Sequence, residues 1–391
     1  MLDEYYKINI YFKKDIEMKN NLTKKEINNL YNWAKKYGIE ELQTKDINEL
    51  LNIKELIIMK DMVYKKTFYI PNEFFKLVNL KELHIKSANL KSLSKEIGNL
   101  VNLEKLSIGS YRSYNNICKL KKLPKEIGEL TNLKELEIIC DNLKEIPHEI
   151  CNLINLKKLE INCEELKELP KEIANLTSLK EFKIISYNLE KLPDEIRKLT
   201  NLESLKINCN KLTKLPKWIG DFTKLKYIDI SCKNLKELPK EIGNLTKLKY
   251  FTLWENNLTK FPKEIGNLIN LEYFAINYGY NLKEFPKEIT NLIKLRDLRM
   301  EDCYKIKELP KEIGNLINLK RLIIDEAGLK EMPKEIKNLI NLEYIEIKWD
   351  GYAKGLPNEI LNFNKLKDIR ITKMSPIYKR TMRKKVKIRK L

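Results

Sequence analysis

Prolines recur at a fixed interval along this chain, and this period constrains the fold more than any other feature. Of the 13 prolines, all but Pro376 occupy one place in a repeated unit, and Ser94 fills that place once. The interval is 23 residues, apart from three steps of 24 and one of 30, over Pro71, Ser94, Pro124, Pro147, Pro170, Pro193, Pro216, Pro239, Pro262, Pro286, Pro310, Pro333 and Pro357. A period of this length indicates a solenoid, in which neighbouring units complete one another's core.

Each unit contains two blocks that differ in hydrophobic spacing. Alternation in "LESLKINCNKL" predicts a short strand with one buried face, formed by Leu202, Leu205, Ile207 and Leu212. The following "LPKWIGDFTKL" has helical spacing over a very short element, at Leu215, Ile219, Phe222 and Leu225. We expect the proline at the first helical position, where its missing N–H costs nothing. A glutamate two residues later then faces the positive end of the helix dipole.

These two blocks resemble the leucine-rich repeat family. The 23-residue LPxxIxxLxxL form is similar to plant intracellular Ras-group, Scribble-type and bacterial repeat proteins, over about Ile53 to Thr372. The resemblance implies an α/β solenoid of about 13 units in residues 53–372, a horseshoe with a parallel β-sheet on its concave face. Short helices or 3-10 turns are expected on the convex face.

One departure from the family concerns its inward asparagine. It is present at Asn210 and Asn256, but other units carry different residues there: Ala88, Asp141, Glu164, Tyr187, Lys233 and Ala327. An asparagine often follows one place later, at Asn89, Asn142, Asn188, Asn234 and Asn281. Because the family's asparagines satisfy buried backbone groups, we expect locally altered turns in these units.

The two ends of the chain lack the repeat. Residues 1–52 are predicted to form a helical cap, because Thr23 and Glu26 have capping-box spacing and Gly38 is a plausible C-cap. A second short helix is expected around Asp46 to Leu51. A short targeting role for the first twenty residues is the alternative, with no diagnostic motif.

Residues 373–391 form a basic tail with nine Lys or Arg and no acids, within a chain of net charge +20. It could bind nucleic acid or an anionic membrane, be a disordered solubilising end, or finish the last repeat as a strand. Its candidate contacts are Lys379, Arg380, Arg383, Lys384, Lys385, Lys387, Arg389 and Lys390.

No catalytic motif, cofactor-binding motif or metal-ligand spacing is present, so we predict a protein without enzymatic activity, cofactor or metal. Most carboxylates recur at the same place in each repeat, so their presence has a structural reason and does not indicate a catalytic site. Four cysteines occupy the eighth place of their units and are interpreted as inward packing residues, rather than metal ligands: Cys140, Cys163, Cys209 and Cys232. His84 is expected on the concave face and His148 after Pro147.

The third, fifth and seventh places of each strand block point away from the core and carry the candidate binding residues. They are Tyr227, Tyr250, Trp254, Tyr273, Arg299, Arg321 and Tyr344, with Tyr278 joining from the normally inward eighth place. Tyr227, Tyr250 and Tyr273 share one place in successive units, which predicts an aromatic column with Trp254 close by. Partner binding fits this composition, and packing of the rings on one another and on lysine stems is the alternative. The convex side, with lysine after each proline, is interpreted as solvated.

The sequence therefore favours a non-enzymatic scaffold that binds a protein on the concave face. The family resemblance makes a small GTPase or another signalling protein a possible partner. One alternative is anchoring through the basic tail, with the repeats as a spacer; another is a secreted bacterial effector. No small-molecule substrate is indicated. With no apolar leader or membrane-length segment and an odd cysteine count, we expect a cytoplasmic protein, or one exported by a signal-peptide-independent route.

Overall fold

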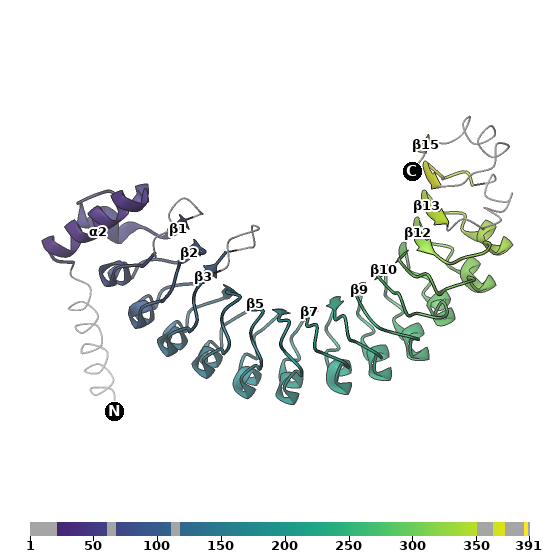
Figure 1. Cartoon of the computed structure of the whole chain (residues 1–391), viewed down its shortest axis with the longest axis horizontal. Coiled ribbons are helices and arrows are strands. Elements are labelled where there is room, and N and C mark those ends of the chain that lie inside the picture. The colour runs from purple at the N-terminus through teal and green to yellow at the C-terminus, as the bar shows by residue number, and fades with distance from the viewer. Residues whose placement is uncertain (1–21, 61–67, 111–117, 350–362, 372–386, 390–391) are drawn as a thin grey trace, which may run out of the picture. The chain divides into compact units, whose positions relative to one another are not determined.

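The computed structural model describes residues 22–60, 68–110, 118–349, 363–371 and 387–389. The chain divides into two compact units, Met1–Leu179 and Lys180–Leu391, which are described separately. In each unit, parallel strands line one side and short 3-10 turns line the other (Figure 1). The expected solenoid is confirmed, and its turns are 3-10 rather than α-helical.

The first unit begins with helices and continues as five repeats. Its helical elements are α2 (Lys24–Tyr37), η1 (Glu40–Leu42) and α3 (Ile47–Asn52). Its parallel strands, neighbours in chain order, are β1 (Glu55–Lys60), β2 (Glu82–Ser87), β3 (Lys105–Gly109), β4 (Glu135–Ile139) and β5 (Lys158–Asn162). The 3-10 turns are η2 (Asn72–Lys76), η3 (Lys95–Asn99), η4 (Lys125–Glu129), η5 (His148–Asn152) and η6 (Lys171–Asn175).

The second unit continues the pattern with strands that again neighbour one another in chain order. They are β6 (Glu181–Ile185), β7 (Ser204–Asn208), β8 (Tyr227–Ser231), β9 (Tyr250–Trp254), β10 (Tyr273–Asn277), β11 (Asp297–Glu301), β12 (Arg321–Ala327), β13 (Tyr344–Trp349), β14 (Asp368–Ile371) and β15 (Lys387–Arg389). The 3-10 turns are η7 (Asp194–Lys198), η8 (Lys217–Asp221), η9 (Lys240–Asn244), η10 (Lys263–Asn267), η11 (Lys287–Asn291), η12 (Lys311–Asn315) and η13 (Lys334–Asn338).

In the described part of the repeat-free segment, residues 22–52, the structure has the helices that the sequence predicted. Thr23 caps α2 in a reciprocal capping box with Glu26, and Gly38 ends the helix in the left-handed conformation, with φ 61°. Asp46 caps α3 by accepting from the N–H of Asn48. The buried face of α2 ends over the first repeat, where Trp33 Nε1 donates to the Tyr69 carbonyl at 2.9 Å.

The prolines lie one residue earlier than expected. Pro124, for example, is the N-cap of η4 in extended backbone (φ −67°, ψ 143°), so the first helical residue is Lys125. The proline carbonyl accepts the first turn hydrogen bond, from the N–H of Ile127 at 3.2 Å. The ring still costs no hydrogen bond at this position, because the donors in this turn come from later residues.

Several of the turns that lead into the strands carry an asparagine whose side chain bonds backward along the chain, a ladder that the sequence reasoning missed. In the first unit, each side-chain amide donates to a backbone carbonyl of the preceding repeat, or of α3 in the case of Asn79, at 2.8–2.9 Å: Asn79 to Leu51, Asn102 to Val78, Asn132 to Val101 and Asn155 to Thr131. In the second unit, Asn270, Asn318 and Asn341 do the same at 2.8 Å. These bonds tie consecutive units together at the start of the strands.

Removing this ladder is expected to weaken the first unit. Replacing Asn102, Asn132 and Asn155 by alanine removes three inter-repeat hydrogen bonds, each worth about 1 kcal/mol, so we expect a loss of about 2–3 kcal/mol. Urea unfolding followed by circular dichroism measures it. Asn152→Ala, an exposed asparagine in η5, is the control. Equal stability of the triple variant and the control would contradict a structural role for the ladder.

The turns after the strands vary between units, but not in the units for which the missing asparagine predicted it: the turn beside Asn256 is altered, and the turn beside Lys233 is like that beside Asn210. The difference appears at the eighth place. Cys209 and Cys232 turn inward and are fully buried. Glu255, Tyr278 and Asp302 occupy the same place but have left-handed backbone, with φ 42°, 59° and 54°. In those units the buried residue is the next one along: Asn256, Gly279 and Cys303. Asn210 was expected to point inward, but it lies half-buried because Cys209 takes the inward position.

Candidate functional site

The strand face of the second unit carries a column of tyrosines. Parallel pairing aligns Tyr227 with Tyr250 and Tyr250 with Tyr273. The first two rings are stacked, with centroids 4.7 Å apart and an interplanar angle of 11°, and the third is 5.9 Å away. Tyr227 is 46% exposed and Tyr250 is 38% exposed. The predicted column is therefore present, and it faces solvent because the alternate residues Ile228 and Phe251 fill the core.

An arginine and aspartate network continues the same face. The Arg299 guanidinium donates to both carboxylate oxygens of Asp297, each at 3.0 Å, and lies 5.2 Å from the Tyr273 ring centroid. Arg321 lies 3.2 Å from the same carboxylate and 4.5 Å from the Tyr344 ring. The bond to Asp297 raises the pKa of Arg299. Ion pairs with Asp297 thus position the guanidinium groups of the two predicted contact arginines. A guanidinium also has a planar face and further N–H donors with which it can contact a ligand.

Tyr344 closes this network at β13. Its hydroxyl donates to Glu346, and the Arg370 guanidinium lies 5.4 Å from its ring. Burial, together with the hydrogen bond to Glu346, raises the pKa of Tyr344 to about 12. A neutral phenol and two arginines over one ring make this end of the face rigid and polar.

Trp254 and Tyr278 lie in a separate group, contrary to the expectation that Trp254 would sit beside the tyrosine column. Trp254 follows Tyr250 by four residues, which places it about 13 Å further along the strand. Its ring contacts Tyr278 at 6.4 Å, Tyr278 contacts Tyr280 at 5.9 Å, and Tyr280 stacks on Tyr304 at 6.0 Å. We call these four residues the strand-end row. Tyr280 and Tyr304 were missed, although "YGYN" after a strand block was the available signal.

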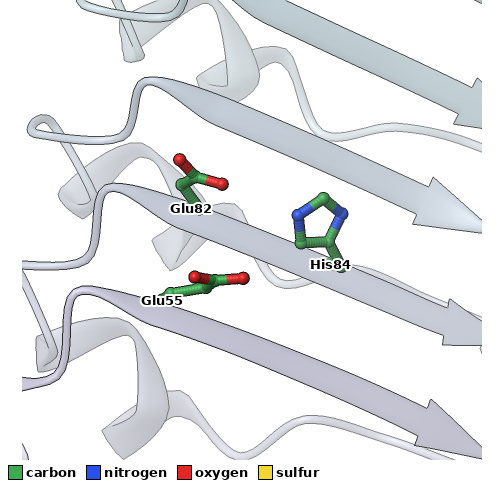
Figure 2. Close-up of side chains that lie close together, drawn as sticks. All are labelled: Glu55, Glu82 and His84. Carbon is green, nitrogen blue, oxygen red and sulfur yellow. The ribbon is translucent and has the colours of Figure 1, made fainter.

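In the first unit, Glu55, Glu82 and His84 gather on the strand face (Figure 2). Parallel pairing sets Glu55 beside Glu82, and one ligand atom from each of the three side chains lies within 4.8 Å of the others. These residue types could hold a divalent cation. However, the Lys105 ammonium lies 3.3 Å from a Glu82 carboxylate oxygen. The hydrogen bond to Glu82 raises the pKa of Lys105, and the negative charges of Glu135 and Glu55 add to the effect. A lysine thus already balances these carboxylates.

The cysteines of the eighth place point into the core, as the packing interpretation expected. Cys140, Cys163, Cys209 and Cys232 are all fully buried and free. Cys163 and Cys232 donate weakly to carbonyls of the preceding repeat, Ile138 and Ile207. Burial raises the pKa of both thiols to about 12, so they remain protonated near neutrality. Neutral thiols in an apolar core are poor metal ligands and nucleophiles.

Two further surfaces are a row of exposed isoleucines and the basic tail. The turns before the strands of the second unit expose a row of aliphatic side chains: Ile269, Ile293, Ile317 and Ile340. In the basic tail, Lys387 and Arg389 belong to β15, which pairs with β14, so part of the tail does form a strand. The other candidate tail residues lie outside the described residues: Lys379, Arg380, Arg383, Lys384, Lys385 and Lys390.

The comparisons with known proteins agree with this geometry. A family model described as a leucine-rich repeat region matches residues 30–165, 113–216, 216–301 and 283–391. The chain belongs to the leucine-rich repeat family. Leucine-rich repeat solenoids generally serve as scaffolds for protein–protein interaction, because they present extended preformed surfaces.

Solved leucine-rich repeat structures share this fold. A leucine-rich repeat protein of Leptospira interrogans is 30% identical, with a TM-score of 0.68 over 90% of this chain and 94% of that one. The internalin InlF of Listeria monocytogenes is 16% identical, with a TM-score of 0.62 over 88% and 96%. A chain of the Drosophila Toll–Spätzle complex is 17% identical, with a TM-score of 0.61 over 81% of this chain and 50% of that one. No curated protein matches in sequence. Among the described residues, no helix has the length and apolarity needed to span a bilayer.

Proposed function

We propose that this protein is a non-enzymatic scaffold that binds a protein partner on the strand face of β8–β13. The observation that carries the proposal is the exposed, stacked pair Tyr227 and Tyr250 beside arginines held at Asp297. Tyrosine and arginine are enriched at interface hot spots, and rigid rings lose little entropy on binding. In the Toll–Spätzle complex, a similar fold assembles with another protein.

The position of the rings matters as much as their chemistry. A strand face has no loops to rearrange, so its side chains are preorganised by backbone pairing and by the core beneath them. Phe251 and Phe274, fully buried under the column, contact each other at 5.5 Å between ring centroids. A partner therefore meets a surface that needs little ordering, which favours affinity.

The test first identifies the partner and then measures its affinity. A photo-reactive residue at Thr252, which lies between Tyr250 and Trp254 on β9, would crosslink a bound protein in a cell extract. The purified partner is then titrated against Tyr227→Ala/Tyr250→Ala. We expect about a 30-fold or greater rise in Kd, because two central hot-spot rings are removed.

Two controls accompany this measurement. Ile293→Ala/Ile317→Ala removes exposed apolar surface away from the strand face and should leave Kd unchanged. A variant ending at Thr372 removes the basic tail. Binding that is unaffected by the tyrosine substitutions but lost with the tail, and retained only at low salt, would reject the scaffold proposal in favour of electrostatic anchoring.

A further inference from the structure

The strand-end row is an exposed aromatic surface with an unusual backbone. Tyr280 and Tyr304 are 46% and 41% exposed, and their rings are nearly parallel, with an interplanar angle of 7°. The neighbouring eighth-place residues Glu255, Tyr278 and Asp302 have left-handed backbone in three successive units. This conformation is strained for a non-glycine residue, and such strain concentrates at functional sites.

Backbone hydrogen bonds hold these three turns in place. The N–H of Glu255 donates to Asn277, that of Tyr278 to Glu301 and that of Asp302 to Asp325, at 3.0–3.1 Å. Each bond extends the sheet ladder by one residue beyond the strand. With this bond kept, the left-handed backbone turns the eighth-place side chain away from the core, whereas Cys209 and Cys232 point inward.

Carboxylates surround the row without lysine or arginine partners. Among the described residues, Glu255, Glu301 and Asp302 form no ion pair within 4 Å. Carboxylates elsewhere differ, since Glu203 and Glu343 each lie between two lysines, which lower their pKa values. Burial, and then the negative charge of Asp325, raise the pKa of Glu301. Three carboxylates without an ion pair thus lie beside the row, with Arg299 and Lys348 as the cations that act on Glu301 from further away.

A buried acceptor lies under the row. Asn277 is only 2% exposed, and its side-chain oxygen has no hydrogen-bond partner among the described residues. Strand pairing places Asn277 directly between Trp254 and Glu301, on the same face of the sheet. A buried polar atom without a partner is destabilising, and a donor from a ligand would relieve this cost.

We propose that the strand-end row and its carboxylates bind an arginine side chain of the protein partner. The proposal rests on the proposed function and specifies the chemistry of the contact. A planar guanidinium can stack on the tyrosine and tryptophan faces while its donors reach Glu301 and Asp302, and a shift of the covering side chains would bring one donor to the buried Asn277 oxygen. A lysine ammonium offers fewer donors and no plane, so arginine fits this arrangement better.

The experiment uses a synthetic peptide of alternating glycine and arginine, and the same peptide with citrulline in place of arginine. Citrulline keeps the planar shape but lacks the charge. Calorimetric titration of the full chain should show binding of the arginine peptide and at least about tenfold weaker binding of the citrulline peptide. A glycine and lysine peptide should also bind more weakly.

Variants localise the effect. Glu301→Gln/Asp302→Asn and Tyr280→Leu/Tyr304→Leu are each expected to weaken the arginine peptide by about tenfold. Glu343→Gln, which removes a lysine-paired carboxylate, should not. Circular dichroism verifies that each variant is folded. Unchanged affinity in the row variants, or equal affinity for arginine and citrulline, would overturn the proposal.

The peptide assay is independent of the natural partner. If the row variants lose the peptide while Tyr227→Ala/Tyr250→Ala keeps its partner, the arginine site stands and the proposed scaffold surface fails. If the tyrosine variant loses its partner while the row variants bind the peptide like the unmodified protein, the scaffold stands and the arginine site is rejected.

Discussion

Raising the pH from about 8.5 to about 10.5 should destabilise this protein by roughly 2 kcal/mol for each of three buried thiols, Cys163, Cys232 and Cys303. Burial raises the pKa of each thiol to about 12. All three are fully buried in the repeats, so the thiolate form is disfavoured only in the folded state.

The direction follows from proton binding. Because the pKa is higher in the folded state, the unfolded chain releases the thiol proton near its ordinary pKa of about 8.5–9 while the folded chain keeps it. The stabilisation is fully present below that pH. It is lost as pH rises from about 9 towards 12, since the unfolded state alone gains from ionisation.

Replacing the three cysteines by alanine should reduce the loss of stability at high pH, while the other buried thiols, such as Cys151, still contribute to it. The triple variant starts less stable at pH 7, because small cavities form, but it should lose about 6 kcal/mol less between the two pH values. Urea unfolding with a reductant at both pH values measures the difference. The control is Ser87→Ala/Ser186→Ala, which alters two buried inward residues at the place of Cys163 and Cys232 without a titrating group. Parallel pH profiles for the triple variant and the unmodified protein would contradict the prediction.

The period of the sequence was sufficient to predict the fold, for a physical reason. Alternation over residues such as Leu205 and Ile207 requires one buried strand face, and a single unit cannot bury it alone. Every unit has the same hydrophobic pattern, so a wrong prediction for one unit does not change the fold predicted for the others. The helices at Thr23 and Asp46 were likewise predictable, because capping depends on residues three or fewer positions apart.

The candidate site was predictable only where it follows the strand register. Tyr227, Tyr250 and Tyr273 meet because pairing in a parallel sheet repeats one place per unit. The predicted position of Trp254 was wrong because its neighbour Tyr278 comes from a turn, where the backbone of Tyr278 has a positive φ. The choice between inward cysteine and outward glutamate at the eighth place depends on burial cost, which periodicity alone does not express.

Charge pairing was the other feature that sequence left open. Arg299 and Arg321 were correctly placed on the strand face, but both converge on Asp297, which lies two residues from Arg299 and one strand from Arg321. Lysines and glutamates alternate through every unit, so many pairings satisfy the composition. Only the rotamers decide which carboxylates, such as Glu301, are left without a partner ion.

Trp33→Ala is expected to destabilise the first unit by about 3–5 kcal/mol. Trp33 is 5% exposed, and its ring lies within about 6 Å of the Tyr37, Phe68 and Phe74 rings, at 5.8, 6.0 and 6.1 Å. Its Nε1 also donates to the Tyr69 carbonyl. This one side chain therefore links α2 to the first repeat, whose core would otherwise face water.

Trp33→Phe separates packing from hydrogen bonding. It keeps an aromatic ring but removes the donor to Tyr69, so it should cost less than the alanine variant, about 1–3 kcal/mol. Hydrogen exchange locates the damage, because repeat stability depends mainly on nearest neighbours. We expect faster exchange in α2 and β1 of Trp33→Ala, and progressively smaller changes towards β5. Uniform acceleration across the unit, or equal stability of the two variants, would show that α2 does not act as a packed cap on the first repeat.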